Sequence, residues 1–265
     1  MTNILLLTDF SKNANNAIRY GMQLFRGEPC NFYVLNVQKI SKYITSDLLT
    51  SPNKTVYDAV IKNPKKKLNI LVNDLKREYA SESYTIDGIC NYDSFISSVK
   101  QVIQSKNIDL IIMGTNGVSG IKETVFGSNT VHVLKNITLP TLVVPENYKF
   151  TKPENILFIY DTKFNDDSIK PLMYFISKFN ASLKVSAAKK ENQNNIITSI
   201  FNGVNIDFIK TNYSLEKNTI EQIVAKYNIE MISKIINTKS FFKRVFSTST
   251  STNLTYASKV PLLFL

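Results

Sequence analysis

The sequence contains little cysteine, and its two thiols stand far apart. Cys30 and Cys90 are the only cysteines among 265 residues, and they form no CxxC pair. This pattern suggests neither a disulfide framework nor a thiolate metal site, so we expect two reduced, buried thiols. Long apolar runs are also absent: none approaches the roughly 18 apolar residues of a membrane span. The apolar residues 4–7 are too short for a signal sequence and run into Asp9. We therefore expect a soluble, cytoplasmic protein without a membrane partner.

The positive charge identifies no partner. The formal net charge is +11, but the basic residues are scattered along a chain rich in Asn, Ile and Lys. The densest basic run, residues 65–67, precedes apolar residues at helical spacing, where lysines usually form a solvated helix face. Those apolar residues are Leu68, Leu71, Val72 and Leu75. Because no recognition motif accompanies the charge, we do not expect a nucleic-acid partner.

The order of predicted elements repeats once along the chain, with a junction near residues 145–153. In the first half, a short apolar strand at residues 3–7 ends in Thr8 and Asp9, and an amphipathic helix follows. In the second half, a strand at residues 155–160 precedes Asp161 and another helix. The apolar helix positions are Ala14, Ala17, Ile18, Gly21 and Leu24 in the first half, and Leu172, Phe175, Ile176 and Phe179 in the second.

Further strands and helices alternate in both halves. Strands are predicted at residues 32–37, 85–89, 109–113 and 140–144, and at 183–187, 205–209, 230–233 and 261–265. Helices are predicted at residues 94–105 and 215–227. Alternation of this kind implies parallel pairing with right-handed crossovers. The fold class is therefore α/β, with two tandem doubly wound, Rossmann-like domains at residues 1–146 and 153–265, each with a five-stranded parallel sheet. Residues 38–59 lack clean periodicity, and both a lid and a plain solvent loop remain open.

Glycines gather at the carboxyl end of the fourth strand of the first half. Residues 114–120 read GTNGVSG, and residues 126–130 read FGSNT before a helix. In an open parallel sheet, ligands bind outside the strand carboxyl ends. Glycines there let backbone N–H groups approach phosphate oxygens, and a helix N-terminus also favours phosphate. The pattern is neither a Walker A motif nor the GxGxxG of dinucleotide folds.

The spacing Gly114-x2-Gly117-x9-Gly127-Ser128 resembles the ATP-binding signature of the universal stress protein family. Residues 4–9 (ILLLTD) resemble the opening strand and Asp of that family, and residues 140–145 (PTLVVP) resemble the end of its domain. The resemblance covers residues 1–145 well and residues 154–265 more weakly. The chain thus resembles a tandem member of the family, whose fold is similar to that of adenine nucleotide alpha hydrolases.

The resemblance implies a set of site residues in the first half. Thr8 and Asp9 would lie by the adenosine, and Val37 would meet adenine through its backbone. Met113 ends the fourth strand at the glycine loop. The residues around the phosphates and ribose would be Gly114, Gly117, Gly127, Ser128, Asn129 and Thr130. Leu7 departs from the proline common there, which a backbone contact tolerates. Asp9 has an alternative interpretation as a helix cap or turn residue, with Ser11 as a competing cap.

The expected cofactor is ATP, or ADP or AMP, with Mg²⁺ neutralising the phosphate charge. No dedicated carboxylate cage is visible. In the second half, residues 235–240 contain no glycine, although Asp161 survives. The Ser/Thr tract at residues 247–252 could cap a helix or hold an anion, and we favour capping. The second domain is therefore expected to be degenerate and to serve as a packing partner, pairing its last strand with that of the first domain.

No catalytic constellation can be assembled from the sequence. His132, the sole histidine, lies at helical spacing from Ser128 and is interpreted as a helix-surface residue. We favour a nucleotide-binding regulatory or stress protein. The alternatives are a slow ATP hydrolase or nucleotidyl-processing enzyme, for which Lys122 and Glu123 are other nearby ionisable residues, and a nucleotide-free scaffold. A monomer and a homodimer both fit a tandem chain.

Overall fold

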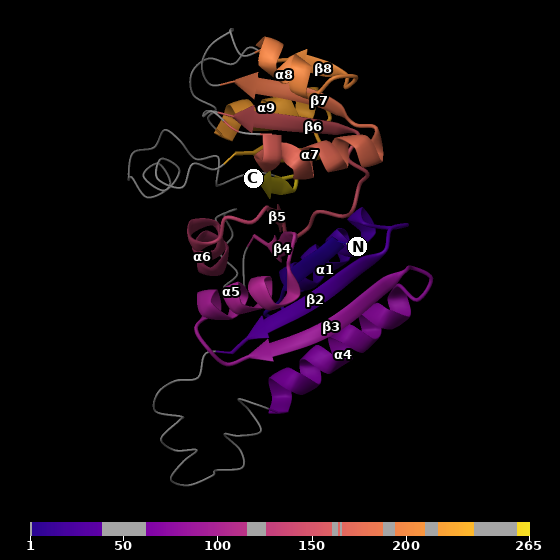
Figure 1. The fold of residues 1–265 in the computed structure, drawn as a ribbon, viewed down its shortest axis with the longest axis vertical. Coiled ribbons are helices and arrows are strands. Elements are labelled where there is room, and N and C mark those ends of the chain that lie inside the picture. Colours follow the sequence, from indigo (N-terminus) through magenta and orange to yellow (C-terminus); the bar gives the residue numbers. More distant parts are fainter. Residues whose placement is uncertain are drawn as a thin grey trace.

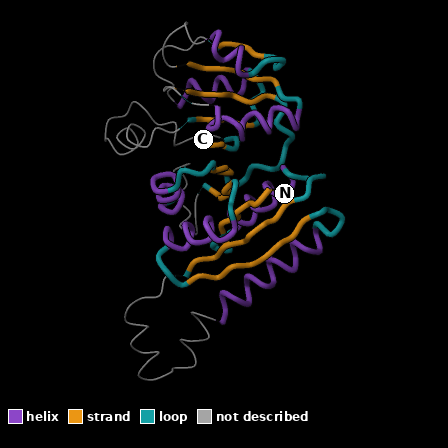
Figure 2. The backbone as a smooth tube through the Cα atoms, in the orientation of Figure 1, coloured by secondary structure: helices purple, strands orange, loops and turns teal. Residues whose placement is uncertain are grey.

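Strands alternate with helices along most of the described part of the computed structural model (Figure 2). It describes residues 2–38, 62–115, 126–160, 164, 166–187, 194–209, 217–235 and 259–265. The first half comprises β1 (Thr2–Leu7), α1 (Lys12–Leu24), β2 (Cys30–Val37), α4 (Asn63–Glu78), β3 (Tyr84–Asn91), α5 (Phe95–Lys106), β4 (Leu110–Gly114), α6 (Ser128–Asn136) and β5 (Thr141–Val144). The second comprises β6 (Asn155–Tyr160), α7 (Asp166–Phe179), β7 (Ser182–Ala187), α8 (Asn194–Ile200), β8 (Ile206–Phe208), α9 (Lys217–Lys226), β9 (Met231–Lys234) and β10 (Leu262–Phe264).

The strands form one continuous ten-stranded sheet in the order β3-β2-β1-β4-β5-β10-β9-β6-β7-β8. All pairs within each half are parallel, which confirms the predicted fold class of two doubly wound, five-stranded units. The halves meet through the antiparallel pair β5–β10, which lies between them in Figure 1. The two edge strands of this order are β3 and β8.

Each face of the sheet is covered by its own layer of helices. Ile4 and Leu6 of β1 belong to the core beneath α1, α4, α7 and α8, whereas Leu5 and Leu7 belong to the core beneath α5, α6 and α9. This alternation is the two-residue period of a strand buried on both faces. In α4, the lysines at residues 65–67 are exposed and the four apolar positions that follow them are buried, as the sequence predicted.

The repeat seen in the sequence recurs in the strand register. Ile4 of β1 lies opposite Leu110 of β4, and Ile156 of β6 lies opposite Met231 of β9. The first and fourth strands of the two halves therefore pair equivalently.

A carboxylate fastens the start of the first strand in both halves. The backbone N–H of Asn3 donates to Asp109 Oδ2 at 2.8 Å, and the backbone N–H of Asn155 donates to Glu230 Oε2 at 2.7 Å. The duplicated contact supports an internal repeat independently of the strand order.

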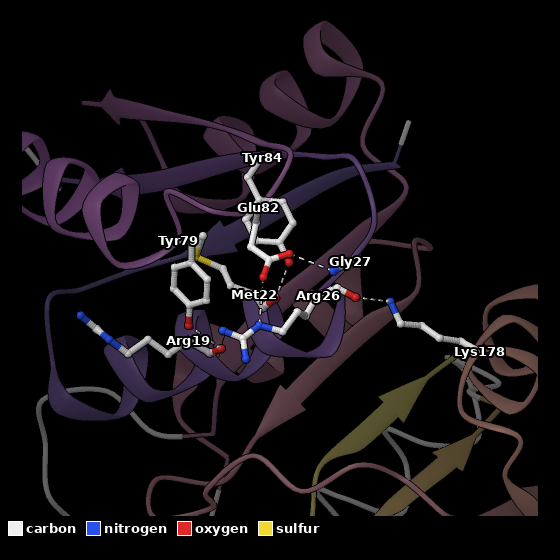
Figure 3. A network of polar contacts seen from close by, with 8 residues as sticks. All are labelled: Arg19, Met22, Arg26, Gly27, Tyr79, Glu82, Tyr84 and Lys178. Atoms are coloured by element: carbon white, nitrogen blue, oxygen red, sulfur yellow. Dashed lines mark hydrogen bonds and ion pairs between the residues drawn. The ribbon is translucent and has the colours of Figure 1, made fainter.

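The residues that follow α1 contact both the turn before β3 and the second half (Figure 3). Glu82 accepts hydrogen bonds from Arg26 Nε at 3.0 Å and from the backbone N–H of Gly27 at 2.9 Å. Gly27 has a φ of 83°, a left-handed conformation that favours glycine. From α7, Lys178 Nζ donates to the Arg26 carbonyl at 3.4 Å. The end of α1 therefore lies beside both the turn before β3 and helix α7 of the second half.

One sequence expectation fails at a cysteine. Both thiols are free among the residues described, and Cys30 is buried as predicted, but Cys90 on the edge strand β3 is only half-buried. The edge position explains the difference, because no further strand covers that side of β3. In the ranges given above, no helix is both long and apolar enough to cross a membrane.

Candidate functional site

The turn that follows β1 is held by its own side chains. Thr8 is 7% exposed, and its hydroxyl accepts a hydrogen bond from the backbone N–H of Phe10 at 3.0 Å. Asp9 Oδ1 accepts from the backbone N–H of Ser11 at 2.9 Å. Ser11 is the N-cap of α1, since its hydroxyl accepts from the Ala14 N–H at 3.1 Å. Asp9 is therefore a turn residue here, and Ser11 is the cap.

Phe10 holds this turn in an unusual backbone conformation. Its φ is 65°, in the left-handed region that a bulky residue rarely adopts. Strained residues persist where the surrounding structure determines them, and they cluster at binding sites. The outlier lies between the two residues that the sequence placed by the adenosine and the start of α1.

The end of β4 is joined to the start of α6 by hydrogen bonds. The Gly127 N–H donates to the Thr115 carbonyl at 2.7 Å. The Thr130 hydroxyl lies 3.1 Å from the Gly114 carbonyl and 3.1 Å from the Thr115 carbonyl, to which it donates. Thr130 is 2% exposed, whereas Ser128 and Asn129 are exposed. The hydroxyl of Thr130 thus positions the helix, and its two neighbours face outward.

Gly114 is packed tightly against α1. A Cβ atom added to Gly114 would lie 2.7 Å from the Cγ, Nδ2 and Oδ1 atoms of Asn13, which is 2% exposed. A side chain at this position would therefore have to displace Asn13, so packing favours glycine here in addition to the close approach that a ligand phosphate would need.

The structure brings most of the predicted site residues together at the side of the sheet where the strands of the first half have their carboxyl ends. β1 lies between β2 and β4, so Thr8, Asp9, Val37 and Gly114 stand at the carboxyl ends of three adjacent strands. Val37 is partly buried. Four other predicted residues form the start of α6: Gly127, Ser128, Asn129 and Thr130. Met113 is buried in the core on the α5 side of the sheet. Gly117 lies outside the described residues.

Two polar residues at this edge were not found from the sequence. Asn36 is 1% exposed, and its side chain reaches the Thr8 carbonyl, while Gln38 bonds to the side chain of Asn36. A signal was present: Asn36 is a polar residue within the otherwise apolar strand at residues 32–37. A buried amide needs hydrogen-bond partners, so its position predicts a specific contact.

In the second half, the position of Gly114 is taken by a large apolar residue. Counting four residues beyond the equivalent first pairs of β4 and β9 places Ile235 where the first half has Gly114. Ile235 is 7% exposed and belongs to the hydrophobic core. Asp161 and the Ser/Thr tract at residues 247–252 lie outside the described residues.

The start of α6 has the properties of an anion site. Its N-cap, Gly127, contributes no side-chain cap, and a helix N-terminus carries unsatisfied N–H groups and a positive dipole end. The exposed Ser128 and Asn129 add polar side chains, so the residues present fit a phosphate group. His132 is exposed on α6, as predicted for a helix-surface residue. Over the described ranges, no group of three or more His, Cys, Asp or Glu side chains could hold a metal ion.

Known proteins resemble part of this chain in sequence and the whole chain in fold. The family model described as Universal stress protein family matches residues 1–145. A universal stress protein of Methanocaldococcus jannaschii is 26% identical over an alignment of 151 positions that covers 53% of this chain and 93% of that protein.

Two solved structures resemble the whole chain. A universal stress protein from Archaeoglobus fulgidus superposes with a TM-score of 0.72 and 17% identity, covering 99% of this chain and 97% of that one. A functionally unknown protein from Pseudomonas aeruginosa has a TM-score of 0.55 and 14% identity, covering 100% of this chain and 92% of that one. At these identities, the likeness concerns the fold.

Proposed function

Because the chain belongs to the universal stress protein family, we propose that its first half binds an adenine nucleotide, and ATP in particular, in a stress-response or regulatory role. The observation that carries the proposal is the junction of β4 and α6. The contact from Gly127 to Thr115 brings the open start of α6 to the carboxyl end of β4. An anionic group held there would lie at the edge of the sheet that also presents Asp9 and Val37.

In this proposal, the parts of the ligand meet different elements. The phosphates meet the backbone N–H groups and side chains of Ser128 and Asn129, where the helix dipole favours negative charge. The adenosine lies by the turn after β1 and the end of β2. Mg²⁺ would be held by phosphate oxygens and water, as this ion usually is when few carboxylates are available. Thr130 contributes by fixing the helix start rather than by direct contact.

The second half has a structural role in the proposal. We assign residues 1–146 to a nucleotide-binding domain and residues 153–265 to a degenerate copy. Ile235 supports this division, because a large buried side chain occupies the position of Gly114. A cytoplasmic location is part of the same proposal.

The experiment is a calorimetric titration of ATP with Mg²⁺ into protein stripped of bound nucleotide. Wild-type protein should bind one ATP per chain, and Gly127→Leu should weaken binding at least about tenfold, since a bulky N-cap obstructs phosphate approach. Ser81→Leu, an equally bulky change at an exposed turn, is the matched control and should bind as wild type does.

Each stoichiometry has a distinct meaning. One site per chain that is lost in Gly127→Leu supports the proposal. Two sites per chain would contradict the degenerate second half. The absence of binding to the stripped wild-type protein would favour a nucleotide-free scaffold. Release of inorganic phosphate from bound ATP, followed over hours, would distinguish a slow hydrolase from a sensor.

A further inference from the structure

A hydrogen bond to the backbone fixes the orientation of the Asn36 side chain. Its Nδ2 lies 2.8 Å from the Thr8 carbonyl oxygen, and the residue is 1% exposed. A carbonyl oxygen can only accept, so the NH₂ group of Asn36 must face Thr8. The Oδ1 atom of Asn36 is consequently turned to its other side.

Asn36 in turn fixes the orientation of Gln38. The Nε2 atom of Gln38 lies 2.6 Å from Asn36 Oδ1, and Gln38 must donate there because that oxygen can only accept. The backbone N–H of Gln38 also donates to the Asn91 carbonyl at 2.9 Å, which anchors the residue just beyond β2. Within the part of the chain that the structure describes, Gln38 Oε1 accepts no hydrogen bond, and the side chain is partly exposed.

We propose that Gln38 selects adenine over guanine, with Asn36 as the positioning residue that sets the direction of its amide; this rests on the nucleotide binding proposed above. A Gln amide matches adenine because its oxygen accepts from the exocyclic amino group while its NH₂ donates to a ring nitrogen. Gln38 retains both functions, since Asn36 uses only one of its two amide hydrogens. It follows Val37 directly, at the strand end assigned to the base.

The fixed direction of the amide is what discriminates. Guanine has a carbonyl oxygen where adenine has the amino group, so the amide of Gln38 would have to turn over to pair with it. Turning over would place Gln38 Oε1 against Asn36 Oδ1, and two acceptors cannot bond to each other. Guanine is therefore disfavoured by the chain of hydrogen bonds from Thr8 through Asn36 to Gln38.

The test compares ATP and GTP, each with Mg²⁺, by calorimetry on the full-length protein. Gln38→Met removes both polar functions at nearly constant size, and ATP affinity should fall about tenfold while GTP affinity changes little. Asn36→Ala removes the hydrogen bond that orients the Gln38 amide. The ratio of ATP affinity to GTP affinity should therefore decrease, mainly because GTP binds more tightly. Gln104→Met, an exposed glutamine on α5, is the matched control and should keep the wild-type ratio.

The outcomes separate this inference from the proposed function. If the wild-type protein binds ATP and Gln38→Met keeps the wild-type preference, the inference is wrong while nucleotide binding stands. If Asn36→Ala weakens ATP and GTP equally, its role is structural only and the positioning claim is wrong. If the wild-type protein binds neither nucleotide, both the proposed function and this inference fail. Thermal melts of each variant identify unfolded protein, and an unfolded Asn36→Ala leaves Gln38→Met to decide.

Discussion

Gly114 at the end of β4 lies against the side chain of Asn13 in the first turn of α1, so closely that a Cβ atom would stand 2.7 Å from three of its atoms. The contact joins the glycine loop to the helix that follows the Asp9 turn. The two chain segments of the candidate site are therefore positioned by each other and not only by the sheet.

This contact predicts that Gly114→Ala destabilises the protein. The new methyl group must displace Asn13 and with it the start of α1, and overpacking of this kind costs about 1–3 kcal/mol. Urea unfolding of the purified variant measures the loss. Asn13→Ala in the same chain should restore part of the stability, giving a coupling energy above about 0.5 kcal/mol. Strictly additive effects of the two substitutions would show that the contact does not limit this position.

Thr130→Val should loosen the start of α6. The substitution keeps the size of the side chain but removes the hydroxyl that donates to the Gly114 and Thr115 carbonyls, and we expect a loss of about 1–2 kcal/mol in the free energy of unfolding. Thr138→Val, at an exposed position after the same helix, should change stability little. Equal effects of the two substitutions in urea unfolding would argue against a positioning role for Thr130.

The junction of the halves should depend on pH through Glu28. Burial raises the pKa of Glu28, but hydrogen bonds from Lys178 and Tyr174 outweigh it, so the pKa lies below its ordinary value. Lys178 Nζ is 2.6 Å from Glu28 Oε1, and the Tyr174 hydroxyl donates to the other oxygen. A depressed carboxyl pKa adds stability above the unfolded-state pKa, about 4.3, and this stability is lost as the pH falls through the folded-state value.

Lys178→Met should therefore be destabilising at pH 7 and less so at pH 3, because the interaction of Lys178 with Glu28 weakens as the falling pH protonates the Glu28 carboxylate. Urea midpoints at the two pH values give the comparison. Lys67→Met, at an exposed position of α4, serves as the control and should leave the pH dependence unchanged. A constant difference between wild type and Lys178→Met across this range would contradict the role assigned to Glu28.

The two cysteines should react at very different rates. Burial, followed by the nearby Glu28 charge, raises the pKa of the Cys30 thiol to about 11, and Cys30 is fully buried. The thiolate is the reactive form, so Cys30 should resist alkylation at pH 8 in the native protein. Cys90 is half-buried and should be labelled first. Mass spectrometry after iodoacetamide treatment locates the label. Unfolded protein is the control, in which both cysteines react. Labelling of Cys30 before Cys90 in the native protein would contradict this burial pattern.

The sequence by itself determined most of the secondary structure and the location of the candidate site. Apolar strands alternating with amphipathic helices predict parallel pairing, because a strand buried on both faces and a helix with one apolar stripe can be combined in few ways. The glycines at 114 and 127 marked the two segments of the candidate site, the end of β4 and the start of α6, because glycine is the residue type that permits close approach of the backbone.

Only the tertiary structure decided how the side chains at that edge are used. Thr130 and Ser128 look equivalent in the sequence, yet Thr130 is buried with its hydroxyl bonded to β4 while Ser128 is exposed. A hydrogen bond joins Asn36 to Thr8, which lies 28 positions earlier in the chain, and a second one joins Asn36 to Gln38. Such pairs follow from strand register and the direction of individual amides. Residue type and spacing do not carry this information, because a hydrogen bond depends on the relative position of two atoms in the folded chain.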